Sequence, residues 1–211
     1  ISAFSRTAES PMAREKDEAK RQTIMVVAKR LFAQRGYQAT SIADLAREAG
    51  LPVGSVYTYF ENKEALLRCV VEEGWGEFFD GLQSALALSE SPERGLALIV
   101  YKMLPSLFKD VDLISILLSE GARFVSLETK LESLASVLEG LIVKLAESRG
   151  IPLAFPAEEA KAAICVFFLG SLDTVRLAKS AGLEVAEKDI IAFIRLAIEN
   201  SFRMELPPGQ A

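Results

Sequence analysis

Glycine and proline residues divide this chain into long intervals, and every long interval has the apolar spacing of an α-helix. Apolar residues recur three and four positions apart within each interval, and no segment shows the alternation of a half-buried strand. In the first interval one helical face collects five apolar residues, namely Ile24, Val27, Ala28, Leu31 and Phe32. The sequence therefore predicts an all-α fold.

The same punctuation sets the ends of the expected helices. Gly36 supplies a left-handed stop for the first helix, and Ser91 followed by Pro92 is typical of a helix start. Pro105 should end or kink the helix that contains it. Helices are expected over residues 15–35, 42–49, 53–60, 63–88, 92–108, 112–123, 127–148, 157–180 and 187–204.

The composition is that of a packed globular protein, with 50% apolar and 25% charged residues. The longest nearly unbroken apolar stretch runs from Ala162 to Leu172, well short of the roughly 20 residues that cross a bilayer. Residues 1–11 lack the charged and then apolar pattern of a signal peptide. We therefore expect a cytoplasmic protein without membrane attachment, with a disordered segment over residues 1–14.

The chain contains no histidine, which removes the commonest general base and the commonest metal ligand. Its two cysteines, Cys69 and Cys165, belong to no metal-binding spacing and are expected to be reduced core residues. Catalysis by carboxylates or lysine stays open but has no positive signal. We therefore expect no metal, no cofactor and no catalytic residues.

Charge is distributed unevenly along the chain. Residues 1–68 carry 11 Lys and Arg against 8 Asp and Glu, a net charge of +3, whereas the remainder carries 13 against 21, a net charge of −8. This asymmetry indicates a basic head over residues 15–68 on an acidic body over residues 69–211.

The head contains two short helices joined by a tight turn. Ser41 can cap the first of them with Asp44 three residues on, and Gly50 permits the left-handed backbone of the turn. The second helix begins near Val53, and Asn62 caps the long helix that follows. Two short helices in this order form a helix-turn-helix unit, whose second helix enters the DNA major groove.

Four segments of this region resemble the DNA-binding signature of the TetR family of one-component repressors. They run from Thr40 to Ala46, over Ala49 and Gly50, from Gly54 to Phe60 and from Asn62 to Leu66. The resemblance covers about residues 20–70 and implies only an architecture for the body. It implies DNA contacts for five residues, namely Thr40, Ser55, Tyr57, Tyr59 and Lys63.

The residues themselves are compatible with that reading. Tyr57 and Tyr59 lie about 200° apart on a helix, so they cannot share one face and one of them points outward. In one alternative Tyr57 packs into the core and only Tyr59 is exposed. Ser55 and Thr58 offer small polar groups for phosphates or base edges, and Val53 would make apolar contact, for instance with a thymine methyl.

Lys63 lies in the first turn of a helix, where the macrodipole disfavours a cation by roughly 0.3–1 kcal/mol. A DNA phosphate would reverse that penalty, although surface lysines are common. Thr40 and Ser41 could cap a helix, contact phosphate, or both. The candidate DNA-binding residues are Thr40, Ser41, Val53, Gly54, Ser55, Tyr57, Thr58, Tyr59 and Lys63.

The helices over residues 156–181 and 187–204 are apolar nearly all round, so both sides of each must be covered. Covering one side with a partner chain gives a four-helix interface in a twofold homodimer; the alternative is a central helix pair within a monomer. The candidate interface residues are Val166, Leu169, Gly170, Asp173, Ile191, Ile194, Ile198 and Phe202.

The body also supplies aromatic residues that could line an effector cavity, with a gap opened beside Pro105. Such a cavity would favour a lipophilic or aromatic effector, although most of these side chains have ordinary core spacing. Arg123 could meet an acidic group of the ligand or pair with Glu120. The candidate effector residues are Trp75, Phe78, Tyr101, Met103, Phe108, Arg123, Phe124 and Phe168.

These observations together predict a homodimeric transcriptional regulator that binds operator DNA. We expect a repressor that a small effector releases from the operator by shifting the spacing of its two heads. The alternative is a helical small-molecule binding protein without DNA affinity.

Overall fold

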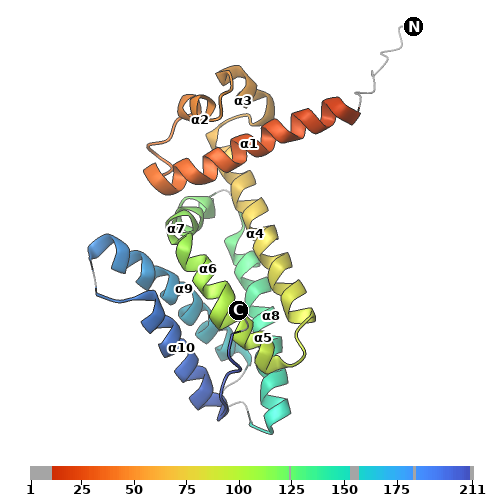
Figure 1. The fold of residues 1–211 in the computed structure, drawn as a ribbon, viewed down its shortest axis with the longest axis vertical. Coiled ribbons are helices and arrows are strands. Elements are labelled where there is room, and N and C mark those ends of the chain that lie inside the picture. Colours follow the sequence, from red (N-terminus) through yellow and green to blue (C-terminus); the bar gives the residue numbers. More distant parts are fainter. Residues whose placement is uncertain (1–10, 124, 153–156, 183, 210–211) are drawn as a thin grey trace. The chain divides into compact units, whose positions relative to one another are not determined.

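The computed structural model describes residues 11–123, 125–152, 157–182 and 184–209, and only the backbone of residues 11–16, 122, 157–161, 163–165, 167 and 168. Every regular element in this part of the chain is helical, as predicted (Figure 1). The chain forms two compact units, one ending at Val70 and the other beginning at Val71. This division lies close to the boundary predicted from the charge.

The N-terminal unit consists of α1 (Pro11–Arg35), α2 (Ile42–Glu48), α3 (Val53–Tyr59) and the first turns of α4 (Lys63–Ala87). Helix α1 begins at Pro11, so the disorder expected over residues 1–14 is wrong for residues 11–14; residues 1–10 lie outside the described part. The apolar face predicted on α1 is buried. The other three helices also contribute buried residues to this unit, namely Leu45, Ala46, Val56, Leu66, Leu67 and Val70.

The turns of this unit follow the local chemistry of the sequence. Gly36 (φ +84°) and Gly50 (φ +66°) both adopt the left-handed backbone that was predicted. The Ser41 hydroxyl accepts a hydrogen bond from the Asp44 N–H and caps α2, and the Asp44 carboxylate accepts one from the Ser41 N–H, which completes the predicted capping box. The Asn62 side chain accepts a hydrogen bond from the Ala65 N–H and caps α4.

The C-terminal unit contains the remainder of α4 and six further helices. These are α5 (Pro92–Leu98), α6 (Leu104–Lys109), α7 (Val111–Ser119), α8 (Leu127–Arg149), α9 (Ala157–Ala181) and α10 (Glu187–Phe202). A 3₁₀ turn (Gly121–Arg123) follows α7. Figure 1 shows α8, α9 and α10 beside α5 and α6 in this unit.

A π-helical segment, Ile99–Met103, joins α5 to α6 immediately before Pro105. Proline cannot donate the backbone hydrogen bond that an α-helix requires. The helix accommodates Pro105 by widening, and the Leu104 N–H bonds to the Ile99 carbonyl five residues back. The prediction that Pro105 would end or kink this helix is thus only partly right, because the helical path continues with a changed pitch.

The chain after α10 returns to the core of the C-terminal unit. Met204 and Leu206 are buried in one cluster with Val100, Leu104 and Phe108. The Leu206 N–H donates to the Glu199 carboxylate at 3.0 Å. This short segment is therefore an integral part of the body.

Among the helices of the described residues, none is long and apolar enough to span a bilayer.

Candidate nucleic-acid interface

Helix α3 exposes one face built from residues four positions apart. Val53 is 43% exposed and Tyr57 is 52% exposed, while Val56 is fully buried. Gly54 and Thr58 lie beside them and are also exposed, whereas Ser55 and Tyr59 are half-buried. The alternative in which Tyr57 packs into the core is therefore wrong.

Gly54 is not required by the packing of the free chain. A Cβ atom at this position would meet no atom within 4 Å, and its backbone is not left-handed. The missing side chain instead leaves the start of α3 flat between Val53 and Tyr57. A flat, exposed helix start allows close approach by another molecule.

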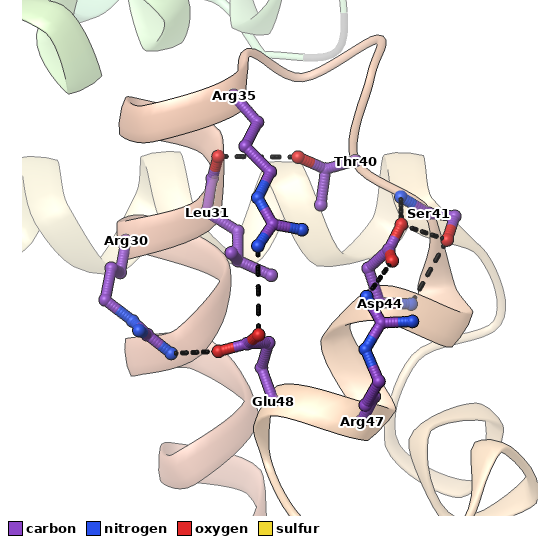
Figure 2. A network of polar contacts seen from close by, with 8 residues as sticks. All are labelled: Arg30, Leu31, Arg35, Thr40, Ser41, Asp44, Arg47 and Glu48. Atoms are coloured by element: carbon purple, nitrogen blue, oxygen red, sulfur yellow. Dashed lines mark hydrogen bonds and ion pairs between the residues drawn. The ribbon is translucent and has the colours of Figure 1, made fainter.

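Thr40 does not belong to this exposed surface, contrary to the prediction. Its side chain is 1% exposed, and its hydroxyl donates to the carbonyls of Gly36 at 2.8 Å and Leu31 at 3.4 Å (Figure 2). These carbonyls lie at the end of α1, where the helix leaves its last acceptors without intrahelical donors. Thr40 therefore ties the α1–α2 loop to α1.

The Lys63 ammonium lies against the same loop. It donates to the carbonyls of Tyr37 and Thr40 at 2.9 Å each and to that of Gln38 at 3.4 Å. It also lies 4.4 Å from the centroid of the Tyr37 ring. Backbone carbonyls thus offset the unfavourable position of a cation at a helix start in the free chain, and a DNA contact by Lys63 stays a prediction.

The capping box at the start of α2 extends into an ion pair. Ser41 and Arg47 both bond to the Asp44 carboxylate (Figure 2). The hydrogen bonds from the Ser41 side chain and backbone, and then that from Arg47, lower the pKa of Asp44 from 3.8 to about 2. The predicted capping role of Ser41 is confirmed, and its exposed hydroxyl faces the carboxylate of its own helix.

Glu48 joins α2 to α1 through two arginines. Arg30 approaches its carboxylate at 2.9 Å and Arg35 at 3.8 Å, and Figure 2 shows both guanidinium groups directed from α1 toward Glu48. All three side chains are partly exposed, so these pairs contribute little to stability. They do hold the side chains of Arg30, Arg35 and Glu48 in place between α1 and α2.

Tyr59 ends α3 and is held by α1. Its hydroxyl donates to the Asp17 carboxylate at 2.5 Å. This hydrogen bond is the main reason that the pKa of Tyr59 is raised from 10.0 to about 12. Nothing in the local sequence pointed to this contact, because the two residues lie 42 positions apart.

The C-terminal unit contains a small apolar cavity beside the π-helical segment. About 250 Å³ of space, part of it open to solvent, is enclosed by side chains of α4, the π-helical segment, α6 and α8. The lining residues are Phe78, Leu82, Ile99, Met103, Leu104, Leu107, Leu134 and Leu138. Only Phe78 and Met103 were among the candidate effector residues, because the sequence analysis favoured aromatic side chains and the lining is mostly aliphatic.

The other candidate effector residues lie elsewhere. Phe108 is fully buried in the core; Trp75 stacks on Phe79 at 6.1 Å between ring centroids. Tyr101 packs against the core, and Arg123 is exposed and pairs with Glu120 at 3.9 Å, which confirms the alternative reading of that arginine. Phe124 and the side chains of Phe168 and Cys165 lie outside the described residues.

Helices α9 and α10 present large apolar side chains at the surface of the single chain. Val166 is 70% exposed and Phe193 is 63% exposed, and Leu177 and Leu196 are exposed as well. Of the other candidate interface residues on α9, Gly170 and Asp173 are exposed and Leu169 is half-buried.

The interface residues predicted on α10 lie mostly toward the core of the body, and their role in a dimer stays a prediction. Ile194 is buried in the core, and Ile191, Ile198 and Phe202 pack against that core. The exposed face of α10 is instead formed by Phe193 and Leu196. A helix that is apolar nearly all round gives no sequence signal for which side faces inward.

No cluster of three potential metal ligands occurs among the described residues.

Two short helices joined at a glycine turn, with the second helix exposed, form a helix-turn-helix unit. Residues 24–70 match the family model for bacterial regulatory proteins of the tetR family. This match lies within the N-terminal unit.

Curated relatives share part of this chain. It is 30% identical over 103 residues to an uncharacterized HTH-type transcriptional regulator, YuxN, of Bacillus subtilis, covering 49% of this chain and 35% of the relative. It is 26% identical over 127 residues to the fatty acid metabolism regulator protein of the same organism, covering 57% of this chain and 65% of the relative. The matches thus span about one third and just under two thirds of these relatives.

A solved structure shares the fold over most of its length. The transcriptional regulator FadR from Bacillus subtilis, in complex with stearoyl-CoA, superposes with a TM-score of 0.60 at 22% identity. The superposition covers 86% of this chain and 94% of that one. At this identity the likeness shows that the two chains have a common architecture.

Proposed function

We propose that this protein is a homodimeric transcriptional repressor that binds operator DNA through α2 and α3 and is released by a lipophilic effector. The exposed face of α3 carries this proposal, because a short helix with a buried back and a flat, exposed front is what a major groove admits. The TetR-family match over residues 24–70 covers the whole of this element.

The effector part of the proposal is supported by the cavity in the C-terminal unit. All eight of its lining side chains are apolar, so an acyl chain fits its chemistry better than a polar ligand does. The enclosed space is far smaller than an acyl chain, so a ligand must displace side chains to enter it. Helix α4 contributes Phe78 and Leu82 to this cavity and Lys63 to the N-terminal unit.

The dimer part is supported by the exposed apolar side chains of α9 and α10. Large apolar residues exposed on a single chain are typical of a surface that another subunit covers. Two heads in one dimer would read the two halves of a palindromic operator.

DNA binding is tested with the full chain and a labelled duplex from the region preceding its own reading frame. Val53→Ala should weaken binding to this duplex, because it removes an exposed side chain from the groove-facing surface. Val26→Ala is the matched control, since Val26 is also exposed but lies on α1. Equal affinity of both variants and the wild type would contradict the assigned interface, and a wild type without sequence preference would favour the small-molecule binding protein.

The effector is tested by adding acyl-CoA thioesters of increasing chain length to the preformed complex. Release of DNA should require a long chain, and Leu138→Trp should reduce that release because added bulk fills the cavity. Leu88→Trp introduces the same side chain at an exposed position directly after α4 and should leave the response unchanged. Release by every acyl-CoA in the Leu138→Trp variant would exclude this cavity as the site.

A further inference from the structure

The carboxylate of Asp17, on α1, lies beside Tyr59 at the end of α3. Asp17 precedes Ile24, the first buried residue of α1 in the described part, by seven positions. Seven residues return to within about 20° of the same helical face. Asp17 therefore continues the face with which α1 covers α2 and α3, but it does so as an exposed anion.

The partner of this carboxylate is the hydroxyl of Tyr59. The O–H of Tyr59 donates to Asp17 Oδ1 at 2.5 Å, and both side chains keep contact with solvent. A phenol has one hydrogen to donate. While Asp17 accepts that hydrogen, Tyr59 has none for another anion.

We propose that Asp17 restrains DNA binding by occupying the Tyr59 hydroxyl in place of a backbone phosphate. This inference rests on the proposed function, since it assumes that duplex DNA approaches α3. Carboxylate and phosphate oxygens are both anionic acceptors, so they compete for the same donor. A phosphate that reaches Tyr59 also comes close to the Asp17 charge, and like charges at this range repel.

The opposite role for Asp17 would be to hold Tyr59 in the orientation that binds DNA. The two roles predict opposite signs. If Asp17 competes with phosphate, its neutralisation strengthens DNA binding; if it orients Tyr59 for DNA, its removal weakens binding.

The test compares Asp17→Asn with Glu18→Gln in the full chain, by fluorescence anisotropy with the labelled upstream duplex. Both variants remove one negative charge from neighbouring positions of α1, but Glu18 accepts hydrogen bonds from Arg21 and Gln22. Asp17→Asn should bind DNA about two- to fivefold more tightly than the wild type, the size of one exposed charge interaction. Glu18→Gln should show a clearly smaller gain. Asp17→Ala, which removes the acceptor altogether, should gain at least as much as Asp17→Asn and serves if the asparagine variant is poorly folded.

Tyr59→Phe removes the hydroxyl and so tests whether the effect of Asp17 depends on it. In this background Asp17→Asn should gain no more than Glu18→Gln does, because no donor remains to be released. An unchanged or lower affinity of Asp17→Asn, or an equal gain in the Tyr59→Phe background, would overturn the inference while leaving DNA binding by the wild type intact. Failure of the wild type to prefer the duplex would overturn the proposed function as well.

Discussion

Replacing Lys63 by methionine should destabilise the N-terminal unit itself, apart from any effect on DNA. The substitution keeps an unbranched apolar stem and removes the ammonium. Two hydrogen bonds of 2.9 Å to the carbonyls of Tyr37 and Thr40 are lost, together with the contact to the Tyr37 ring at 4.4 Å. The α1–α2 loop then keeps the Thr40 hydrogen bonds and the packing of the Tyr37 ring against Phe32 of α1.

The magnitude follows from these contacts. Hydrogen bonds from a charged donor contribute about 1.5–3 kcal/mol each, and a partly exposed cation–π contact about 0.5–1 kcal/mol. Lys63 is half-buried, and removing it also relieves a dipole penalty of roughly 0.3–1 kcal/mol and frees up to about 2 kcal/mol of side-chain entropy. The net loss is therefore about 2 kcal/mol, which corresponds to a fall of roughly 10 °C in the unfolding temperature of a unit of this size.

The assay is hydrogen exchange of peptides from residues 24–60 during a thermal ramp, because these peptides report the N-terminal unit alone. The single tryptophan, Trp75, lies in the other unit, and its fluorescence monitors that unit separately. Lys20→Met removes an exposed lysine from α1 and is the matched control. If Lys63→Met protects these peptides as well as Lys20→Met does, the carbonyl contacts contribute nothing and the reasoning is refuted.

Three further outcomes are expected. The lowered pKa of Asp44 means that its contribution to stability is present above pH 3.8 and is lost as the pH falls toward about 2. Hydrogen exchange of peptides from residues 24–60 should therefore show a smaller loss of stability over this pH range in Asp44→Asn than in the wild type. Phe193→Glu should shift the protein to monomers in sedimentation velocity, whereas Val26→Glu, equally exposed, should leave the dimer intact. Leu206→Ala should destabilise the C-terminal unit by about 2 kcal/mol, the lower end for a buried leucine because a chain end relaxes; denaturant unfolding followed by Trp75 fluorescence, with exposed Leu88→Ala as the control, measures this.

The features that the sequence predicted correctly are those decided within about five residues. Ser41 and Asp44 cap one another across three positions, and Gly50 adopts the left-handed backbone directly after the α2 C-cap. Asn62 and Ser91 cap their helices in the same way. In each case the donor, the acceptor and the turn belong to one short segment, so the residue types and their spacing are enough to predict the interaction.

The features that could not be predicted depend on contacts between distant segments. Lys63 bonds to carbonyls 23–26 residues earlier, and its position at a helix start gave no sign of these contacts. Thr40 resembled an exposed polar residue, yet its hydroxyl satisfies carbonyls at the end of α1. Polar side chains near a helix end can meet either solvent or backbone, and only the path of the chain decides between them.

The exposed face of α3 carries no lysine or arginine, and this constrains how the proposed repressor recognises DNA. Its sequence from Val53 to Tyr59 is entirely uncharged. The electrostatic part of DNA binding, which sets its salt dependence, must then come from basic residues outside α3, above all those of α1 and the predicted contact Lys63, while α3 discriminates between sequences through Val53 and Tyr57. Asp17 lies where these two contributions meet, because it is an anion on the basic helix and it binds the last residue of α3. A single carboxylate at that point can tune affinity without altering the groove-facing side chains, so affinity and specificity are separable in this head.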